Sequence, residues 1–308
     1  MIKVDLITGF LGSGKTTFIK RYAKYFTDRG QRIGILVNDY GAVNVDAMLL
    51  QELEGEQCII ETVAGACDAD CHKRRFKTKL IALGMSGLDR VIIEPSGVFD
   101  VDVFFDSLYE EPLDKWYEIG SVIAVVEACL PQHLSDSAEY LLGSQAASAG
   151  AIVLSKTDVA DADEAATVEH IRRALQAVKC GRSIENAVIV KQFDTYTDKD
   201  FERIANSGRV SESYVKHGTA DDSGFCSLCF MNSPITAQAL EQAAKDILQS
   251  PDCGEVFRVK GFVRNGDGWL ELNATKGSTK LSPIAKGQEI IIVIGENLNK
   301  ENIGRYLY

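Results

Sequence analysis

The sequence predicts an α/β domain with a mostly parallel sheet, followed by a small α+β domain. Short apolar runs alternate with helical patterns from the N-terminus to about residue 208. Strands that alternate with helices form parallel sheets with right-handed crossovers. After the polar, turn-rich stretch Ser207–Gly224 the order changes to strand, helix and several strands. We therefore expect a first domain over 1–208, a linker over 209–223 and a second domain over 224–308.

Apart from Asp5 in the first run, the apolar runs of the first domain are unbroken rather than alternating, as expected of parallel strands that are buried on both faces. They are Val4–Ile7, Ile33–Val37, Val91–Ile93, Val122–Val126, Ile152–Leu154 and Ala187–Val190. Between the first two runs, Phe18, Ile19, Tyr22 and Phe26 recur at helical spacing, and Gly30 is a candidate helix stop.

The second domain combines one amphipathic helix with several strands. We predict the helix over Thr236–Leu248 and strands over Glu255–Val263, Trp269–Asn273 and Glu289–Ile294, with a last helix at the C-terminus. Strands that follow one another without intervening helices favour an antiparallel sheet. The pattern is that of a small α+β domain.

Composition and charge narrow the classes of partner. The net charge is −11, from 33 basic and 44 acidic residues. Because binding to nucleic acid needs clustered Lys and Arg, we expect no nucleic-acid partner. We find no run of 18 apolar residues and no signal-peptide pattern, so we expect a cytoplasmic protein without a membrane span. In that compartment the eight cysteines should be thiols or metal ligands rather than disulfides.

The segment Gly9–Thr17, GFLGSGKTT, follows the first predicted strand directly. It matches the phosphate-binding pattern G-x-x-x-x-G-K-[ST] in its required strand–loop–helix context. Lys15 would place its charge on the β and γ phosphates, and the Thr16 hydroxyl would bind Mg²⁺. The residues expected to contact nucleotide here are Gly12, Ser13, Gly14, Lys15, Thr16 and Thr17. The competing interpretation is a glycine-rich turn that fits by chance. We expect this loop to face solvent.

A second motif follows the predicted strand at residues 91–93 and reads Glu94-Pro95-Ser96-Gly97. An acidic residue at the carboxyl end of a strand beside the phosphate loop is well placed to face a metal ion. Gly97 could present its N–H to the γ-phosphate at little steric cost. The alternative makes Glu94 a surface turn residue. We take Lys15, Thr16, Glu94 and Gly97 as the candidate catalytic residues.

A third motif, Ser155-Lys156-Thr157-Asp158, is a variant of the base-recognition motif N-K-x-D. The Asp158 carboxylate can accept hydrogen bonds from both the ring N–H and the amino group of guanine, a pair that adenine lacks. The stem of Lys156 would cover the plane of the base. Ser155 stands where the pattern usually has Asn. The motif therefore favours guanine over adenine. It argues against the hypothesis of an ATP-dependent kinase with the same phosphate loop.

With these motifs in place, the chain resembles the CobW, HypB and UreG family of GTPases, most closely its CobW-like branch. The resemblance covers nearly the whole chain. It includes the phosphate loop, VNDYG at 37–41 with Val45-Asp46 as a first switch, EPSG at 94–97 as a second switch, SVIAVVEA at 121–128 and LSKTD at 154–158. It implies slow GTP hydrolysis coupled to delivery of a transition metal, as by a metallochaperone, or to assembly of a metallocofactor.

The chain departs from the CobW-like pattern in two places. That branch usually has N-E-x-G-E in its first switch, whereas this chain has Asp39 and Ala42 in place of the two glutamates. Asp39 and Asp46 are further candidate Mg²⁺ ligands. The C-x-C-C motif that the branch carries between the switches is replaced by Gly65-Ala66-Cys67-Asp68-Ala69-Asp70-Cys71-His72.

Cys67, Cys71 and His72 are nevertheless candidate ligands for a transition metal. If the segment enters a helix, Cys67 and Cys71 share a face, and His72 lies about a third of a turn away. Two thiolates and an imidazole suit tetrahedral Zn²⁺, and Co²⁺ is the other metal we consider. Candidates to complete the shell are Asp68, Asp70 and Glu61. The alternative is a pair of free thiols beside an exposed histidine.

Two functions from different classes are compatible with these motifs. In the first, GTP hydrolysis controls metal transfer to a protein client. In the second, the chain is a GTP-dependent switch or assembly factor that binds a client without carrying metal. The expected small-molecule partners are GTP and GDP, and a homodimer is one of the assemblies that the sequence leaves open.

Overall fold

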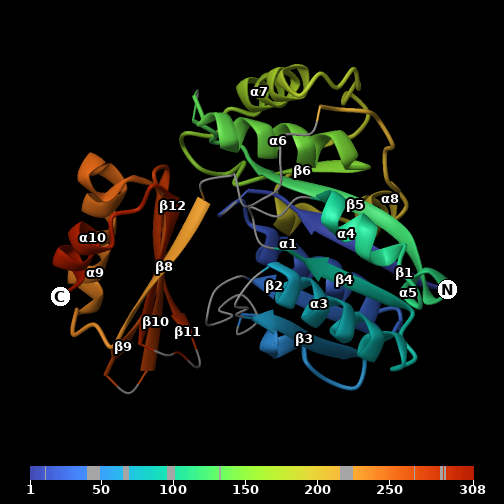
Figure 1. Ribbon diagram of the computed structural model, residues 1–308, viewed down its shortest axis with the longest axis horizontal. Helices are drawn as coiled ribbons and strands as arrows, with labels where there is room; N and C mark the ends of the chain where they lie inside the picture. The colour runs from blue at the N-terminus through green and yellow to red at the C-terminus, as the bar shows by residue number, and fades with distance from the viewer. Residues whose placement is uncertain are drawn as a thin grey trace. The chain divides into compact units, whose positions relative to one another are not determined.

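The computed structural model describes residues 1–10, 12–39, 49–64, 69–95, 101–131, 133–215, 225–266, 268–284, 287 and 289–308. The chain forms two compact units, Met1–Ala220 and Asp221–Tyr308 (Figure 1). The first unit is α/β and the second is α+β, as the sequence predicts.

The first unit is built on a seven-stranded sheet in the order β3-β2-β4-β1-β5-β6-β7. Its strands are β1 (Ile2–Thr8), β2 (Ile33–Asp39), β3 (Cys58–Ala64), β4 (Arg90–Glu94), β5 (Tyr117–Glu127), β6 (Ala151–Ser155) and β7 (Val188–Val190). Every pairing between them is parallel. The prediction of a parallel sheet is therefore confirmed.

The strands follow the apolar runs of the sequence, with one exception. All six runs lie within strands, except that β7 begins one residue after Ala187. Strand β3 was not predicted. It is one of the two edge strands, and within the described residues it pairs only with β2. Its central residues, among them Glu61 and Thr62, are only half-buried. An edge strand does not need the continuous apolar run that marks a central parallel strand.

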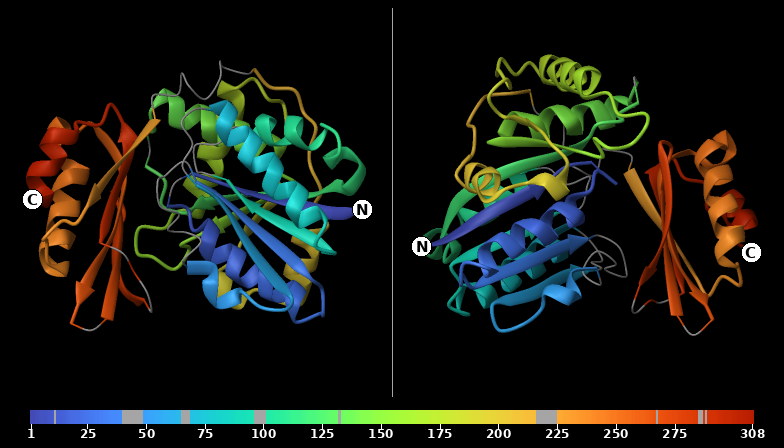
Figure 2. Two further views of the ribbon diagram at one scale, coloured as in Figure 1. Left: turned by 60° about the horizontal axis from the view of Figure 1, so that its bottom comes forward. Right: turned by 180° about the vertical axis from the view of Figure 1, so that it is seen from behind.

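Helices cover both faces of this sheet. They are α1 (Lys15–Thr27), α3 (Ala69–Gly84), α4 (Val101–Leu108), α5 (Leu113–Trp116), α6 (Asp136–Ser148), α7 (Glu164–Ala177) and α8 (Asp198–Ala205), with the short 3₁₀ turns η1 (Gln51–Leu53) and η2 (Phe193–Thr195). Each face of the sheet has its own hydrophobic core. Helices α1 and α8 pack on one face, and α3, α4, α6 and α7 pack on the other (Figure 2). None of the helices in the described part of the chain has the length and apolar character that crossing a membrane requires.

Helix α1 shows how the sequence determines one of these packings. Its buried face consists of Phe18, Ile19, Tyr22 and Phe26 together with their neighbours, which is the stripe that the sequence predicts. The helix ends at Thr27, and Gly30 follows with φ +74°, a conformation that L side chains rarely adopt. Gly30 therefore turns the chain back toward β2.

The second unit is a five-stranded antiparallel sheet with helices packed on it. The strand order is β11-β10-β9-β12-β8. The elements are β8 (Phe225–Met231), α9 (Ala237–Gln249), η4 (Pro251–Cys253), β9 (Glu255–Asn265), β10 (Gly268–Thr275), β11 (Ser278–Ile284), β12 (Ile290–Glu296) and α10 (Lys300–Leu307). Leu240, Ala244 and Ile247 of α9 enter one core with Val259 and Leu272 of the sheet. Strand β11 was not predicted.

The first residues of the predicted linker pack on the first unit. The Val210 N–H donates to Ser148 O at 3.2 Å and the Val215 N–H to Val178 O at 2.8 Å. The Arg209 guanidinium lies 3.6 Å from the centre of the Phe105 ring. Residues 216–224 lie outside the described part of the chain. The domain boundaries 1–208 and 224–308 remain a proposal.

Candidate nucleotide site

The residues of the sequence motifs lie at the carboxyl ends of adjacent strands. β1 lies between β4 and β5, and β6 follows β5. β1 leads into the phosphate loop, while β4, β5 and β6 end at Glu94, Glu127 and Ser155. Ligands of open α/β sheets bind outside this edge. The topology therefore brings three separate motifs to one place.

The phosphate loop has positive φ angles at Gly9, Gly12 and Gly14, a backbone conformation that favours glycine. Gly9 has φ +143°, and a Cβ at Gly9 would lie 2.2 Å from Val125 O. Gly14 has φ +93° and is the N-cap of α1. The loop thus ends at a helix N-terminus, where free N–H groups and the helix dipole favour an anion.

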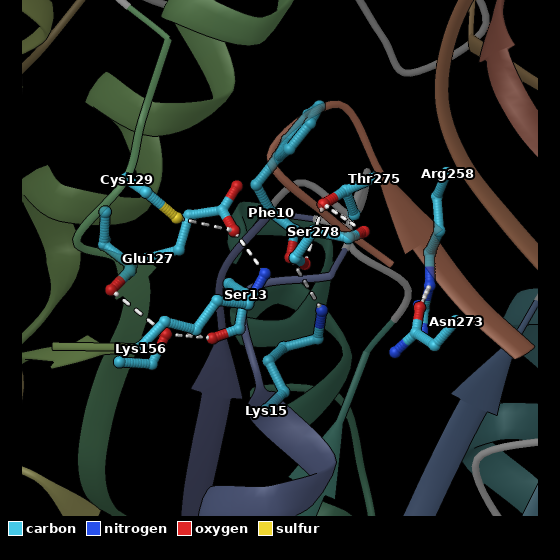
Figure 3. Close-up of polar contacts among 12 residues, drawn as sticks. Phe10, Ser13, Lys15, Glu127, Cys129, Lys156, Arg258, Asn273, Thr275 and Ser278 are labelled. Carbon is cyan, nitrogen blue, oxygen red and sulfur yellow. Dashed lines mark hydrogen bonds and ion pairs between the residues drawn. The ribbon is translucent and has the colours of Figure 1, made fainter. Parts of the chain in front are cut away.

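Lys15 is held inside the loop rather than extended into solvent. Only 7% of the residue is exposed, and its Nζ donates to Gly9 O at 2.9 Å and to Phe10 O at 3.3 Å (Figure 3). The expectation of a solvent-facing position is wrong for this side chain, because the loop wraps around it. The ammonium is nevertheless within the loop that would surround a phosphate.

Thr16 and Glu94 meet beside the loop. The Thr16 hydroxyl donates to Glu94 Oε1 at 2.8 Å, and Glu94 is 3% exposed, so it is not a surface turn residue. A hydroxyl and a carboxylate are hard oxygen ligands of the kind that Mg²⁺ prefers. The two residues fit a Mg²⁺ ion, which would neutralise phosphate charge when bound. Gly97 lies outside the described residues.

The turn that follows β6 contains the proposed base-reading residues. Ser155 is 3% exposed, and its hydroxyl donates to Ser13 O of the phosphate loop at 2.5 Å. Lys156 has φ +54°, and Asp158 is exposed on the same turn. The serine that replaces the usual Asn therefore links this turn directly to the phosphate loop.

Two residues at this edge were not singled out by sequence reasoning. Glu127 ends β5 and accepts a hydrogen bond from Lys156 Nζ at 2.5 Å (Figure 3). Phe193 of η2 lies beside Gly14, since a Cβ at Gly14 would lie 3.9 Å from the Phe193 ring. The available signal for Glu127 was an acidic residue ending a buried strand, the same signal that identified Glu94.

The candidate transition-metal ligands are only partly covered by the structure. Cys71 and His72 lie in the first turns of α3, which begins at Ala69, but their side chains are not among those described. Cys67 lies outside the described residues, so their shared helix face stays a prediction. Glu61, a candidate to complete the shell, forms an ion pair with Lys79 at 2.6 Å.

The other acidic candidates are equally open. Asp39 is the last residue of β2 and its side chain is not described, while Asp46 and Asp68 lie outside the described ranges. Asp70 belongs to α3, again without a described side chain. Where side chains are described, no three His, Cys, Asp or Glu residues are grouped closely enough to hold a metal ion.

The parallel sheet, the glycine loop at the start of α1 and the Lys15–Thr16–Glu94 grouping define a P-loop nucleotide-binding protein. Residues 3–186 match the family model described as CobW/HypB/UreG, nucleotide-binding domain. Residues 225–307 match the cobalamin synthesis protein cobW C-terminal domain. The chain belongs to the CobW/HypB/UreG family.

Curated relatives include two proteins of Escherichia coli. The chain is 30% identical to the zinc chaperone YjiA over 168 residues, which is 52% of this chain and 50% of YjiA. It is 28% identical to the zinc chaperone YeiR over 159 residues, 51% of this chain and 47% of YeiR. The chain thus spans about half the length of these relatives. A crystal structure of Zn(II)-bound YjiA GTPase aligns with 99% of this chain and 97% of its own, at 18% identity and a TM-score of 0.39.

Proposed function

We propose that this protein binds GTP with Mg²⁺ and hydrolyses it slowly in the cytoplasm. Hydrolysis would be coupled to delivery of a transition metal to a client protein, or to assembly of a metallocofactor. The observation that carries this proposal is the meeting of three motifs at one sheet edge. The phosphate loop, the Thr16–Glu94 pair and the turn ending at Asp158 each supply what one part of Mg·GTP requires.

Each group has a distinct role in the proposed complex. Lys15 and the loop N–H groups stabilise charge on the phosphates, which is the main task of a protein in phosphoryl transfer. Thr16 and Glu94 hold Mg²⁺. The Asp158 carboxylate accepts from the guanine N–H groups, and its exposure leaves it free to meet the base.

The metal half of the proposal draws on the family. Two relatives are named zinc chaperones, and Cys67, Cys71 and His72 are this chain's candidates to carry Zn²⁺ or Co²⁺. Their place between the two proposed switches suits metal binding that responds to the nucleotide.

Two measurements test the two halves separately. Calorimetric titration of the purified protein with GDP, ADP and their triphosphates should give tighter binding of the guanine nucleotides. Metal analysis should find Zn²⁺ or Co²⁺ in the unmodified protein and much less in a Cys67→Ser, Cys71→Ser variant. Guanine selectivity without bound metal would leave the alternative, a GTP-dependent assembly factor that carries none.

A further inference from the structure

Glu127 is a half-buried acid at the candidate nucleotide site, and the sequence motifs give it no role. It is the last residue of β5, and its side chain is 14% exposed. In the sheet register it lies opposite Ser155, the last residue of β6. Burying a carboxylate this far is unfavourable unless it is paired, so its partners indicate what it does.

The partner of Glu127 is the lysine of the base-reading turn. Lys156 Nζ donates to Glu127 Oε2 at 2.5 Å, and the Lys156 side chain is 22% exposed. The Cys129 thiol lies 3.8 Å from the same oxygen. Burial, and then the Glu127 carboxylate, raise the pKa of Cys129, so the thiol stays protonated and can donate. Figure 3 shows the three side chains together.

The backbone of Lys156 is fixed as well as its ammonium. Its φ of +54° is a conformation that costs a non-glycine residue about 1 kcal/mol or more and persists only where the surroundings enforce it. Two hydrogen bonds hold the adjoining residue, from Ala128 N to Ser155 O at 2.8 Å and from the Ser155 hydroxyl to Ser13 O at 2.5 Å. Lys156 is therefore anchored at both ends.

We propose that Glu127 is a positioning residue for guanine-nucleotide binding. This inference rests on the proposed function. By holding the Lys156 ammonium, Glu127 fixes the methylene stem as a preformed apolar surface for the base, on the same turn as Asp158. Preorganisation of a long side chain raises affinity because its rotamers are not immobilised on binding. Glu127 itself need not touch the nucleotide.

The test is a calorimetric titration of Glu127→Ala with GDP and, separately, with magnesium pyrophosphate, which has no base. We expect GDP affinity to fall roughly three- to tenfold, the range given by ordering one long side chain, while pyrophosphate affinity stays the same. In turnover, the loss should fall on KM rather than kcat. Glu127→Gln, which keeps an oxygen acceptor, should recover part of the GDP affinity.

The matched control is Glu118→Ala, an exposed glutamate at the other end of the same strand, and it should bind like the unmodified protein. Combining Glu127→Ala with Lys156→Ala should weaken GDP binding no further than Lys156→Ala alone.

Three outcomes would overturn the inference. One is a Glu127→Ala variant that binds GDP like Glu118→Ala, and another is equal loss of GDP and pyrophosphate affinity, which would give Glu127 a merely structural role. The third is additive losses in the double variant. A different result, in which the unmodified protein binds pyrophosphate but shows no preference for guanine nucleotides, would contradict the proposed function itself.

Discussion

Lys15 is the side chain on which the proposed phosphate site should depend most directly. Its ammonium is within hydrogen-bonding distance of the carbonyl oxygens of Gly9 and Phe10. A phosphate bound in the loop would compete with these carbonyls for the same charge, and the charged partner forms the stronger hydrogen bond.

We expect Lys15→Ala to abolish GTP hydrolysis and to weaken GTP binding roughly 10- to 100-fold, the value of one or two charge-assisted hydrogen bonds. Because the side chain is buried, its loss should also lower Tm by about 2–4 °C for each kcal/mol of lost stability. Calorimetry and thermal unfolding measure the two effects. Lys20→Ala, at a half-buried lysine of α1 that pairs with Glu52, is the control. Unchanged turnover in Lys15→Ala would show that the phosphate site lies elsewhere.

Asp158 is the residue that we propose selects the base. Asp158→Asn exchanges an acceptor for a donor, so preference should shift from guanosine toward xanthosine nucleotides, with guanine affinity lower by roughly 10- to 100-fold. Titration with GDP and XDP measures the shift. Asp161→Asn, also exposed, should change neither affinity. Equal affinity of the unmodified protein for ATP and GTP would contradict the assignment.

At the scale of elements, α8 depends on one carboxylate at its start. Asp200 accepts from the Thr197 N–H at 2.6 Å, the Thr197 hydroxyl at 2.7 Å and Lys191 Nζ at 2.6 Å. The hydrogen bonds from Lys191 and Thr197 lower the pKa of Asp200 to about 2. The capping box thus connects the segment after β7 to the helix.

Asp200→Asn should destabilise the protein by about 1 kcal/mol at neutral pH. Because the folded pKa lies below the ordinary value of 3.8, the contribution is present above about pH 4 and is lost as the pH falls toward about 2. Urea unfolding at several pH values should show the difference between variant and unmodified protein shrinking over this window. Glu202→Gln, an exposed acid later in α8, should show no such dependence, and a pH-independent deficit in Asp200→Asn would rule out the ionic explanation.

The packing of α6 against α7 depends on a glycine. A Cβ at Gly143 would lie 2.6 Å from Ala174 O and 2.9 Å from Val178 Cγ1. The backbone carbonyl cannot move without displacing α7.

Replacing glycine by alanine stabilises a helix by about 1 kcal/mol, but overpacking costs about 1–3 kcal/mol. We therefore expect Gly143→Ala to lose about 1–2 kcal/mol net in chemical denaturation. Gly181→Ala is the control, since nothing lies within 4 Å of that position. A Gly143→Ala protein at least as stable as the unmodified one would mean that the two helices separate easily.

At the scale of the whole molecule, nucleotide and metal binding should be thermodynamically linked. Cys67–His72 follows the first proposed switch, Asn38–Asp46, and precedes the second, Glu94–Gly97. Switch loops that reorder around a γ-phosphate could pull on the segment between them.

We expect Zn²⁺ affinity to differ about 5- to 150-fold between the GDP form and the form with a non-hydrolysable GTP analogue, with the same factor for nucleotide affinity with and without metal. Metal titrations in the two nucleotide states measure it. The Cys67→Ser, Cys71→Ser variant should lose the difference. Identical metal affinity in both states would show that metal binding at the cysteines does not depend on the nucleotide.

The sequence by itself determined the parallel sheet and the phosphate loop. Both are encoded locally, the strands by runs that are almost entirely apolar and the loop by contiguous residues, Gly9–Thr17, whose spacing fixes its geometry. The turn that we propose binds the base could also be located from the sequence, because Ser155–Asp158 is a contiguous motif. Strand β3 was not, since a half-buried edge strand needs no such run.

Only the tertiary structure decided which of these residues act together. Glu127 and Lys156 pair because parallel strands β5 and β6 end at the same edge, and no local pattern reports a contact across 29 positions of chain. Asp5 is likewise buried in mid-strand, where it accepts from Tyr22, Arg90 and the Ser121 N–H. In the sequence it interrupts the apolar run Val4–Ile7, and no local pattern names its partners. Such charges are tolerated only where the folded chain supplies their partners, and partners are set by strand order rather than by sequence spacing.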